Sequence, residues 1–286
     1  MLSCIDVTNV YFEGFEEDEL CKPGFNKDGK HGPPQIVIGL LVNTDGYPLD
    51  YEIFEGNKFE VHTMIPTIKS FIKKYDLKTL IVIADAGLMS NKNINELNTN
   101  DIKFIIGARI KNETDVVQTK ILQLKLSEGV ISEIQKDTVQ RLVVGYSDAR
   151  AKNDLFNRTK GFNKLKEKVK AGKLTKDNIN NKGYNKYLKL NGEVKIEIDE
   201  VKFNEDKKWD GLKDYLTNTK LSKAEIVAYH TQLWQVEKAF RISKSDLLIR
   251  PIYHFKKERI KALICIIFAS YKLYKELERQ LKIKKL

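Results

Sequence analysis

Three acidic and two basic side chains have the types and spacing that metal and phosphate chemistry needs. Asp6 lies in a β-branched stretch and Asp85 ends an uninterrupted apolar run, both places where open α/β sheets hold ligands. Glu237 borders an apolar helical stripe, and Arg241 and Lys244 follow it by four and seven residues, on one side of a helix. One acid and two cations in line could hold a metal ion and the phosphates on which it acts.

Carboxylates are the ligands that Mg²⁺ prefers, and this ion keeps open positions for water and phosphate oxygens. Two such ions about 3.5 to 4 Å apart can activate an attacking oxygen and stabilise the leaving one. Any metal must be held by carboxylates, because neither the histidines nor the cysteines have the spacing of a metal site. These residues are His31, His62, His230, His254, Cys4, Cys21 and Cys265.

Each acid also has an ordinary structural explanation. An aspartate at a strand end, such as Asp85, is often a turn or helix cap. Asp6 could lie on an exposed edge strand, and Glu237 with Arg241 could be a surface ion pair one helical turn apart. The pattern alone leaves the catalytic and the structural interpretations open.

Hydrophobic periodicity predicts the elements that position the first two acids. Continuous apolar runs separated by helical patterns indicate buried parallel strands in an α/β core. The turn signal NTDGY between two apolar runs predicts a hairpin. The expected order is a strand at 3–12, a loop at 13–34, hairpin strands at 35–42 and 48–54, an amphipathic helix at 62–75, and buried strands at 79–85 and 102–108.

The second half of the chain is predicted to hold an insertion followed by helices. Residues 160–189 contain ten lysines against two acids, with strand-like stretches at 141–147 and 194–203 on either side. Ser222 with Glu225 predicts a helix start, and an apolar stripe follows from Ile226 to Phe240, beside which Trp234 is expected in the core. A last helix is expected at 256–281. The predicted domains are therefore 1–110, 111–220 and 221–286, the second being the insertion.

The net charge of +11 and the sequence pI of about 9.2 favour a polyanionic partner, with nucleic acid ahead of a membrane. With interleaved aromatics, the lysine-rich segment could contact phosphate backbones without sequence preference or be an ordinary solvated face. The odd cysteine count excludes a disulfide framework, and no apolar run is long enough to span a bilayer. A cytoplasmic protein is expected.

Four stretches resemble, in collinear order over nearly the whole chain, the catalytic core of DDE transposases of the insertion-sequence-4 type. They are CIDVTNVYFE, QIVIGLLVNTDGYPLDYEIFEGN, LIVIADAGLMSNKNI and YHTQLWQVEKAFRISKSDLLIRPIYHF. The resemblance implies an RNase H-like mixed sheet flanked by helices, with a β-containing, lysine-rich insertion before the last catalytic helix. It also implies a bacterial insertion sequence as the source of the chain.

The same resemblance implies the site and its partners. Asp6, Asp85 and Glu237 would be the catalytic acids and would hold two Mg²⁺ ions, with Mn²⁺ as a substitute. Arg241, Lys244 and Tyr229 would contact DNA. The partner would be double-stranded DNA, at the element's ends and at the target, with a homodimer assembled on it. The reaction would cut the ends and join the 3′-hydroxyl to target DNA.

The sequence departs from the family pattern in two places. The usual signature has Tyr seven and Arg four residues before the Glu, where this chain has His230 and Leu233, and Tyr229 lies eight before. Family members usually carry a sizeable region before the first Asp, so the chain is expected to be a truncated or split copy. Two alternatives therefore stay open: an inactive DNA-binding remnant that inhibits transposition, and an RNase H-like nuclease.

Overall fold

A computed structural model describes residues 1–13, 17–24, 33–88, 90–172, 174–175, 178–180, 183–191 and 195–284. Much of the loop expected at 13–34, including His31, lies outside these ranges, as do parts of the lysine-rich segment. None of the helices within the described ranges is long and apolar enough to cross a membrane.

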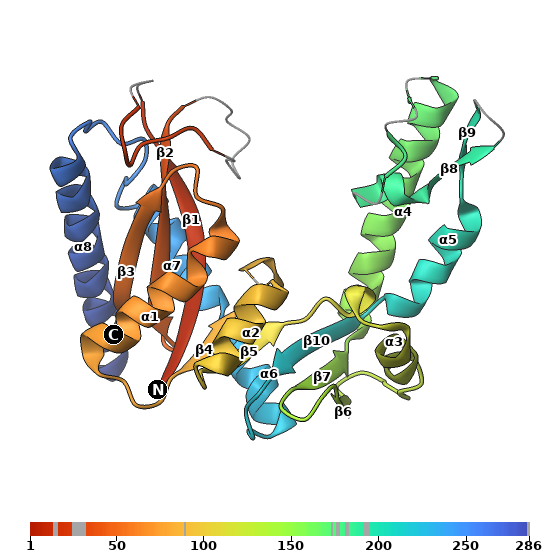
Figure 1. The fold of residues 1–286 in the computed structure, drawn as a ribbon, viewed down its shortest axis with the longest axis horizontal. Helices are drawn as coiled ribbons and strands as arrows, with labels where there is room; N and C mark the ends of the chain where they lie inside the picture. The colour runs from red at the N-terminus through yellow and green to blue at the C-terminus, as the bar shows by residue number, and fades with distance from the viewer. Residues whose placement is uncertain are drawn as a thin grey trace. The chain divides into compact units, whose positions relative to one another are not determined.

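Within the described residues, ten strands form one eight-stranded mixed sheet and one small antiparallel pair (Figure 1). The hydrogen-bonded order in the large sheet is β3-β2-β1-β4-β5-β10-β7-β6, and β8 pairs with β9. The strands are β1 (Leu2–Tyr11), β2 (Gln35–Asn43), β3 (Pro48–Glu55), β4 (Ile81–Ala84), β5 (Lys103–Gly107), β6 (Ile131–Gln135), β7 (Arg141–Tyr146), β8 (Leu188–Asn191), β9 (Lys195–Ile198) and β10 (Leu212–Thr217). The expected mixed α/β fold is therefore confirmed.

Eight α-helices connect these strands in the described ranges. They are α1 (Met64–Tyr75), α2 (Asn91–Thr99), α3 (Asp115–Leu122), α4 (Asp148–Lys170), α5 (Glu200–Glu205), α6 (Lys223–Thr231), α7 (Trp234–Ser245) and α8 (Lys257–Ile283). Short 3₁₀ turns lie between several of them, among them η2 (Ala86–Leu88), η5 (Gly183–Tyr187) and η6 (Asp206–Trp209).

The chain divides into two compact units. The first comprises Met1–Arg109, Asp137–Leu142 and Tyr215–Leu286, and the second comprises Ile110–Lys136 and Val143–Asp214. Strands β7 and β10 cross this division. All six residues that the sequence proposes for the site belong to the first unit.

Helices cover both faces of the sheet in the first unit (Figure 1). Gly39 of β2 lies so close to α1 that a Cβ atom there would sit 2.8 Å from the Thr67 hydroxyl. The opposite face carries α7, which packs on β1 and β2, and α8, which packs on β3. A buried cluster between that face and these helices includes Val10 and Ile38 from the strands and Ile264 and Ile267 from α8. This core fixes α7 and α8 against the centre of the sheet.

Two predicted elements differ from the structure. The stretch 194–203 is not one strand: β9 ends at Ile198, and Asp199 then caps α5 by accepting a hydrogen bond from the Lys202 N–H at 3.0 Å. The single helix expected after Ser222 is two helices, α6 and α7, because the chain turns at residues 232–233. The Ser222 and Glu225 capping box is present as expected.

Candidate active site

The first two acids lie on neighbouring parallel strands. Strand β1 pairs with β4 in the register Leu2 with Ile81, Ser3 with Val82 and Cys4 with Ile83. The same offset, continued by two residues, brings Asp6 level with Asp85. Neighbouring strands run about 4.8 Å apart, and residues that are level in a parallel ladder point to the same face. The register therefore places Asp6 and Asp85 at neighbouring backbone positions on the two strands.

Asp6 is part-buried on the sheet face that α7 covers. Side chains alternate along a strand, so Asp6 shares its face with Thr8 and Val10, which line a cavity beneath α7 and α8. Its Oδ1 accepts a hydrogen bond from the Val7 N–H at 2.7 Å. This local bond holds the carboxylate close to the strand.

Asp85 is exposed and follows directly after β4, where the chain enters η2. Its Oδ2 accepts a hydrogen bond from the Gly87 N–H at 3.3 Å. Gly107, at the end of β5, lies beside it: a Cβ atom on Gly107 would be 3.4 Å from Asp85 Oδ1 and 3.1 Å from the Ala86 nitrogen. Glycines on two sides therefore leave room around this carboxylate.

Glu237 lies in the first turn of α7, the helix that packs on β1. Val236, Ala239 and Ile242 form the buried side of α7, whereas Glu237 is exposed beside them. The break at residues 232–233 has an electrostatic consequence, because a helix N-terminus stabilises a carboxylate in its first turn. A single continuous helix would have lacked this effect.

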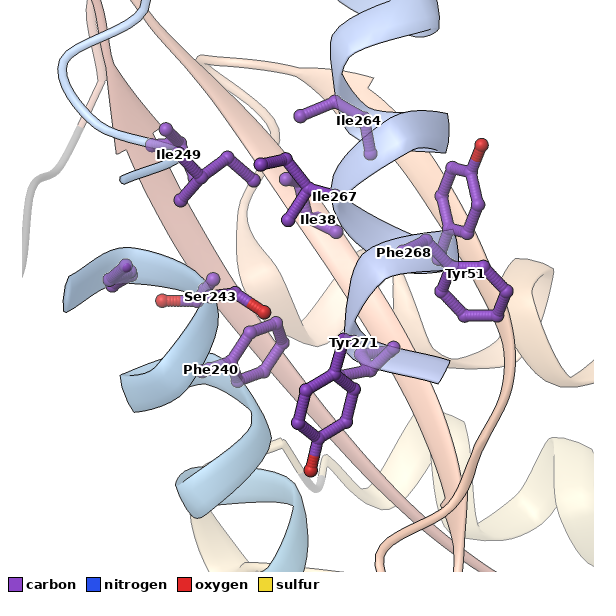
Figure 2. A pocket seen from close by; sticks show the side chains of 13 residues that line it. Ile38, Tyr51, Phe240, Ser243, Ile249, Ile264, Ile267, Phe268 and Tyr271 are labelled. Atoms are coloured by element: carbon purple, nitrogen blue, oxygen red, sulfur yellow. The ribbon is translucent and has the colours of Figure 1, made fainter. Parts of the chain in front are cut away.

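The basic candidates differ in how they are placed. Arg241 is exposed on α7, one turn after Glu237. Lys244 is half-buried and lines the cavity of about 40 Å³ that Thr8 also lines (Figure 2). Lys244 therefore comes close to the β1 face that carries Asp6. Tyr229 is half-buried on α6, apart from the helix that holds the acid.

The interpretation of Trp234 as a core residue is wrong. The side chain is 47% exposed at the start of α7, three residues before Glu237 and so on the same side of the helix. The Lys238 ammonium lies 5.8 Å from the centre of its ring. Trp234 lies beside the apolar stripe and not in it, since Leu233 and Val236 of the stripe are buried, so the periodicity did not decide its exposure.

A carboxylate bridge fixes α7 to α8. Glu278 of α8 accepts hydrogen bonds from Lys238 of α7, at 3.1 Å, and from Lys275. Lys275 is only 6% exposed, so its ammonium depends on this partner. The hydrogen bond from Lys275 is the main reason why the pKa of Glu278 falls to about 2. The bridge holds the helix that carries Glu237, and no sequence pattern indicated it.

The chemistry of the donor set fits Mg²⁺, since all three acids offer hard oxygen ligands. Asp6 and Asp85 occupy neighbouring positions on paired strands, and there is open space beside Asp85, so one metal ion could bind to both carboxylates. In the ranges that the structure describes, no three His, Cys, Asp or Glu side chains are grouped closely enough to hold a metal ion. Asp6 and Asp85 are thus brought together, and Glu237 is not grouped with them.

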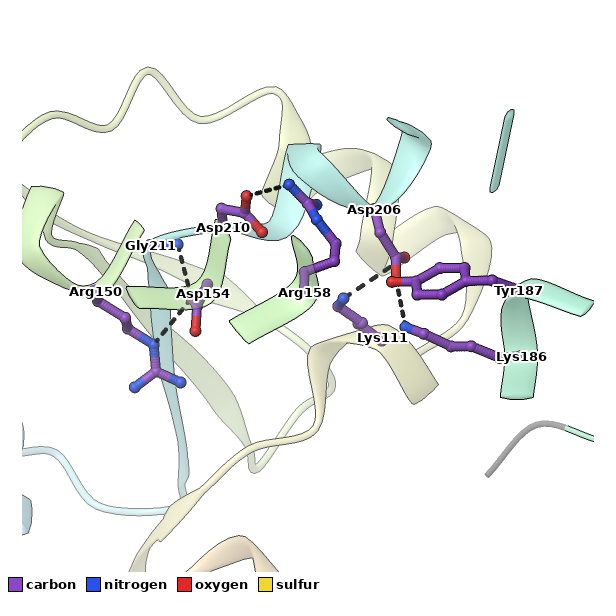
Figure 3. A network of polar contacts seen from close by, with 9 residues as sticks. All are labelled: Lys111, Arg150, Asp154, Arg158, Lys186, Tyr187, Asp206, Asp210 and Gly211. Carbon is purple, nitrogen blue, oxygen red and sulfur yellow. Dashed lines mark hydrogen bonds and ion pairs between the residues drawn. The ribbon is translucent and has the colours of Figure 1, made fainter. Parts of the chain in front are cut away.

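The second unit has its own polar network (Figure 3). Arg158 of α4, 7% exposed, donates to Asp210 at 2.7 Å, and its guanidinium lies 5.1 Å from the Phe203 ring. Asp206 accepts hydrogen bonds from Tyr187, at 2.6 Å, and from Lys186. Burial alone would raise the pKa of Asp206, but these donors lower it. The network joins α4, η5 and η6, so a structural role explains it.

The opposite side of α4 is a basic ridge, which we define as Lys160, Lys164 and Lys168. They are exposed, lie one helical turn apart, and have no ion-pair partner in the described part of the chain. Phe156, 62% exposed, continues the ridge, with the Lys160 ammonium 5.9 Å from its ring centre. The part of the lysine-rich segment that lies in α4 is therefore a solvated helix face, and Phe156 extends it with an exposed aromatic side chain.

A comparison with solved structures shows the class of fold to which the chain belongs. The chain aligns over 99% of its length, with a TM-score of 0.53 and 10% sequence identity, with the solved structure of a piggyBac transposase in a synaptic complex with hairpin DNA. The fold is therefore RNase H-like, as the sequence indicated. The chain spans 48% of that protein's length.

The sequence then gives the family. A model described as the transposase DDE domain matches residues 2–273, and the chain belongs to that family. No curated protein matches the sequence closely enough to count as a relative. The match includes all three acids and also Arg241 and Lys244.

Proposed function

We propose that this chain is the catalytic core of a transposase that cuts DNA at the ends of its own element and joins the freed 3′-hydroxyl to target DNA. The observation that carries the proposal is the register of β1 and β4, which makes Asp6 and Asp85 level on the sheet face covered by α7. Membership of the DDE transposase family supports the same assignment.

Asp6, Asp85 and Glu237 would hold two Mg²⁺ ions, with Mn²⁺ as a substitute. When bound, these ions activate the attacking oxygen and stabilise the leaving oxygen of an in-line displacement. Asp6 would supply its ligand from within β1 and Asp85 from the end of β4, and the pairing of these strands would keep both in place through both reaction steps. Glu237 would supply its ligand from the N-terminal turn of α7, the helix that packs on β1.

Double-stranded DNA is the proposed partner, at the element's ends and at the target. Arg241 and Lys244 extend from the acid's own helix, so they would bind phosphates next to the scissile one. Tyr229 would contact the same strand from α6. The basic ridge of α4 would bind phosphates without recognising the DNA sequence, because lysine ammonium groups that contact phosphates make no contact with base edges.

The proposed setting is a bacterial insertion sequence, with the protein acting in the cytoplasm as a homodimer assembled on DNA. Two ends must be cut and joined together, which requires two active sites. The net charge of +11 suits a protein that handles both end and target DNA.

Strand cleavage tests the proposal. Duplexes carrying the sequences that flank the gene are incubated with the protein and Mg²⁺ or Mn²⁺, and nicks and strand-transfer products are resolved on denaturing gels. Asp85→Asn should reduce cleavage by at least about a hundredfold, as expected when a metal-ligating group is lost. Glu96→Gln is the matched control and should cleave like the parent, because Glu96 is a half-buried acid of α2 whose carboxylate pairs with Lys69 of α1 at 2.6 Å. Equal rates in the parent and Asp85→Asn would refute the assignment.

One observation favours a second candidate, a silent DNA-binding remnant: in the described ranges, the three acids are not grouped closely enough to hold an ion. This candidate predicts salt-sensitive DNA binding, no cleavage by the parent, and no change in binding in Asp85→Asn. The same gels detect an RNase H-like nuclease, which would cut generic DNA with turnover and give no strand-transfer product.

A further inference from the structure

Helix α8 is apolar on two opposite sides. Its buried side, which includes Ile260, Ile264, Ile267 and Tyr271, packs on the core of the first unit. The opposite side carries large apolar side chains in solvent: Ile266 is 62% exposed, Leu273 73% and Leu277 59%. A surface helix usually places charged residues there, so this face is typical of an interaction surface.

The outward side chains form a continuous seam. The seam consists of Ala262, Ile266, Ala269, Leu273 and Leu277, all exposed, at spacings of four, three, four and four residues. This is the spacing by which two helices pack along each other. Small and large residues alternate in its first four positions, so a facing helix can approach closely at the alanines and make apolar contacts at the large side chains.

The seam is complementary to itself when two copies run antiparallel. If a twofold axis passes through Ala269, a residue that lies a given number of positions before Ala269 comes beside the residue of the second copy that lies the same number of positions after it, within one position. Ile266 then lies beside the second copy's Leu273, and Ala262 lies beside its Leu277. Each contact occurs twice, as a closed twofold interface requires.

The charges beside the seam agree with the same alignment. Glu258 and Lys261 are exposed at the beginning of α8, and Glu276 and Arg279 lie near its end. The antiparallel pair brings Glu258 level with Arg279 and Lys261 level with Glu276, within one residue. Acid therefore faces base at both positions. A parallel pair would instead place Glu258 beside Glu258, where like charges repel.

We infer that the outward seam of α8 binds the same seam of a second copy of this chain, antiparallel and centred on Ala269. The inference rests on the homodimer proposed above and names its surface. The seam contact involves no DNA, so we expect it in the free protein as well as on DNA. Its test uses no DNA and no metal, so it can fail while the proposed chemistry stands.

Position-specific crosslinking tests the inference. The exposed Cys265 is replaced by serine, and Cys4 and Cys21 are buried, so a single new cysteine reports on α8. Ala269→Cys lies on the proposed axis and should form an interchain disulfide under mild oxidation. Ala262→Cys is the matched control: it would be about 21 Å from its twin along the helix, far beyond the Cα separation of roughly 7 Å that a disulfide permits.

A second change confirms that the seam drives the contact. Leu273→Glu, added to Ala269→Cys, should reduce the disulfide yield at least tenfold and leave the circular dichroism spectrum unchanged, because Leu273 is 73% exposed and contributes little to the core. Disulfide at 269 but not at 262, lost with Leu273→Glu, is the expected result. Crosslinking at neither position, at both equally, or without response to Leu273→Glu overturns the inference.

Discussion

The bridge between α7 and α8 gives a prediction with a defined magnitude. In Glu278→Gln the carboxylate that serves Lys238 and Lys275 becomes a neutral amide, and the 6% exposed Lys275 ammonium loses its counter-charge. Removing one partner of a buried ion pair costs about 3 kcal/mol or more, and the partly exposed position of Glu278 puts the expected loss at about 2 to 3 kcal/mol. Urea unfolding at pH 7 measures this loss.

The pH dependence provides an independent check. Because the pKa of Glu278 is lowered to about 2, its stabilising effect is complete above the ordinary glutamate pKa and is lost as the pH falls toward 2. A shift from about 4.3 to 2 corresponds to about 3 kcal/mol, close to the value from the ion pair. The difference in unfolding free energy between parent and Glu278→Gln should therefore be constant near pH 7 and shrink between pH 4 and 2.

Glu276→Gln is the matched control. Glu276 lies on the same helix and pairs with Arg279 at 2.7 Å, but in solvent. Exposed pairs contribute little to stability, so this variant should unfold at nearly the same urea concentration as the parent. An equal loss in the two variants, or a Glu278→Gln effect that does not change with pH, would refute the reasoning.

Three further predictions concern other parts of the chain. Gly107→Ala should slow cleavage about tenfold with little change in the urea midpoint, because the new Cβ would be 3.1 Å from the Ala86 nitrogen beside Asp85. Replacing the three lysines of the α4 ridge by glutamine should make the plot of log association constant for DNA against log salt concentration less steep by about 2.7. Replacing the three lysines of α1 by glutamine should leave its steepness unchanged. Fluorescence anisotropy measures both slopes. Burial raises the pKa of Asp214 to about 7, so its carboxyl weakens the fold progressively as the pH rises from about 4 to 7, and the effect is constant above 7. Asp214→Asn should stabilise the protein by about 2 to 4 kcal/mol at pH 8 and not at pH 4 in thermal unfolding.

The fold of the first unit could be predicted from the sequence where local signals and periodicity agree. The NTDGY turn and its flanking apolar runs predicted β2 and β3 within one residue, and Ser222 with Glu225 predicted the start of α6. The break after α6 could not be predicted, because residues 232–233 include neither proline nor glycine. Buried side chains on both sides of the turn, Leu233 and Val236, set the direction of α7 instead.

The site could be predicted in part. The apolar run that ends at Asp85 placed this acid at a strand tip, and the family resemblance added Asp6 and Glu237. The level positions of Asp6 and Asp85 depend on the register of two distant strands, which no local pattern encodes. The Glu278 bridge also joins residues 40 positions apart and follows only from packing. The roles of all three acids stay predictions.

Metal binding tests the central claim most directly. Mn²⁺ is titrated by calorimetry into the parent, into Asp85→Ala and into the control Glu96→Ala, which removes an acid of α2 that pairs with Lys69. If the strand acids form a metal site, saturable heats will be present in the parent and in Glu96→Ala and absent in Asp85→Ala. Indistinguishable heats in all three proteins would contradict the claim that Asp85 is a metal ligand.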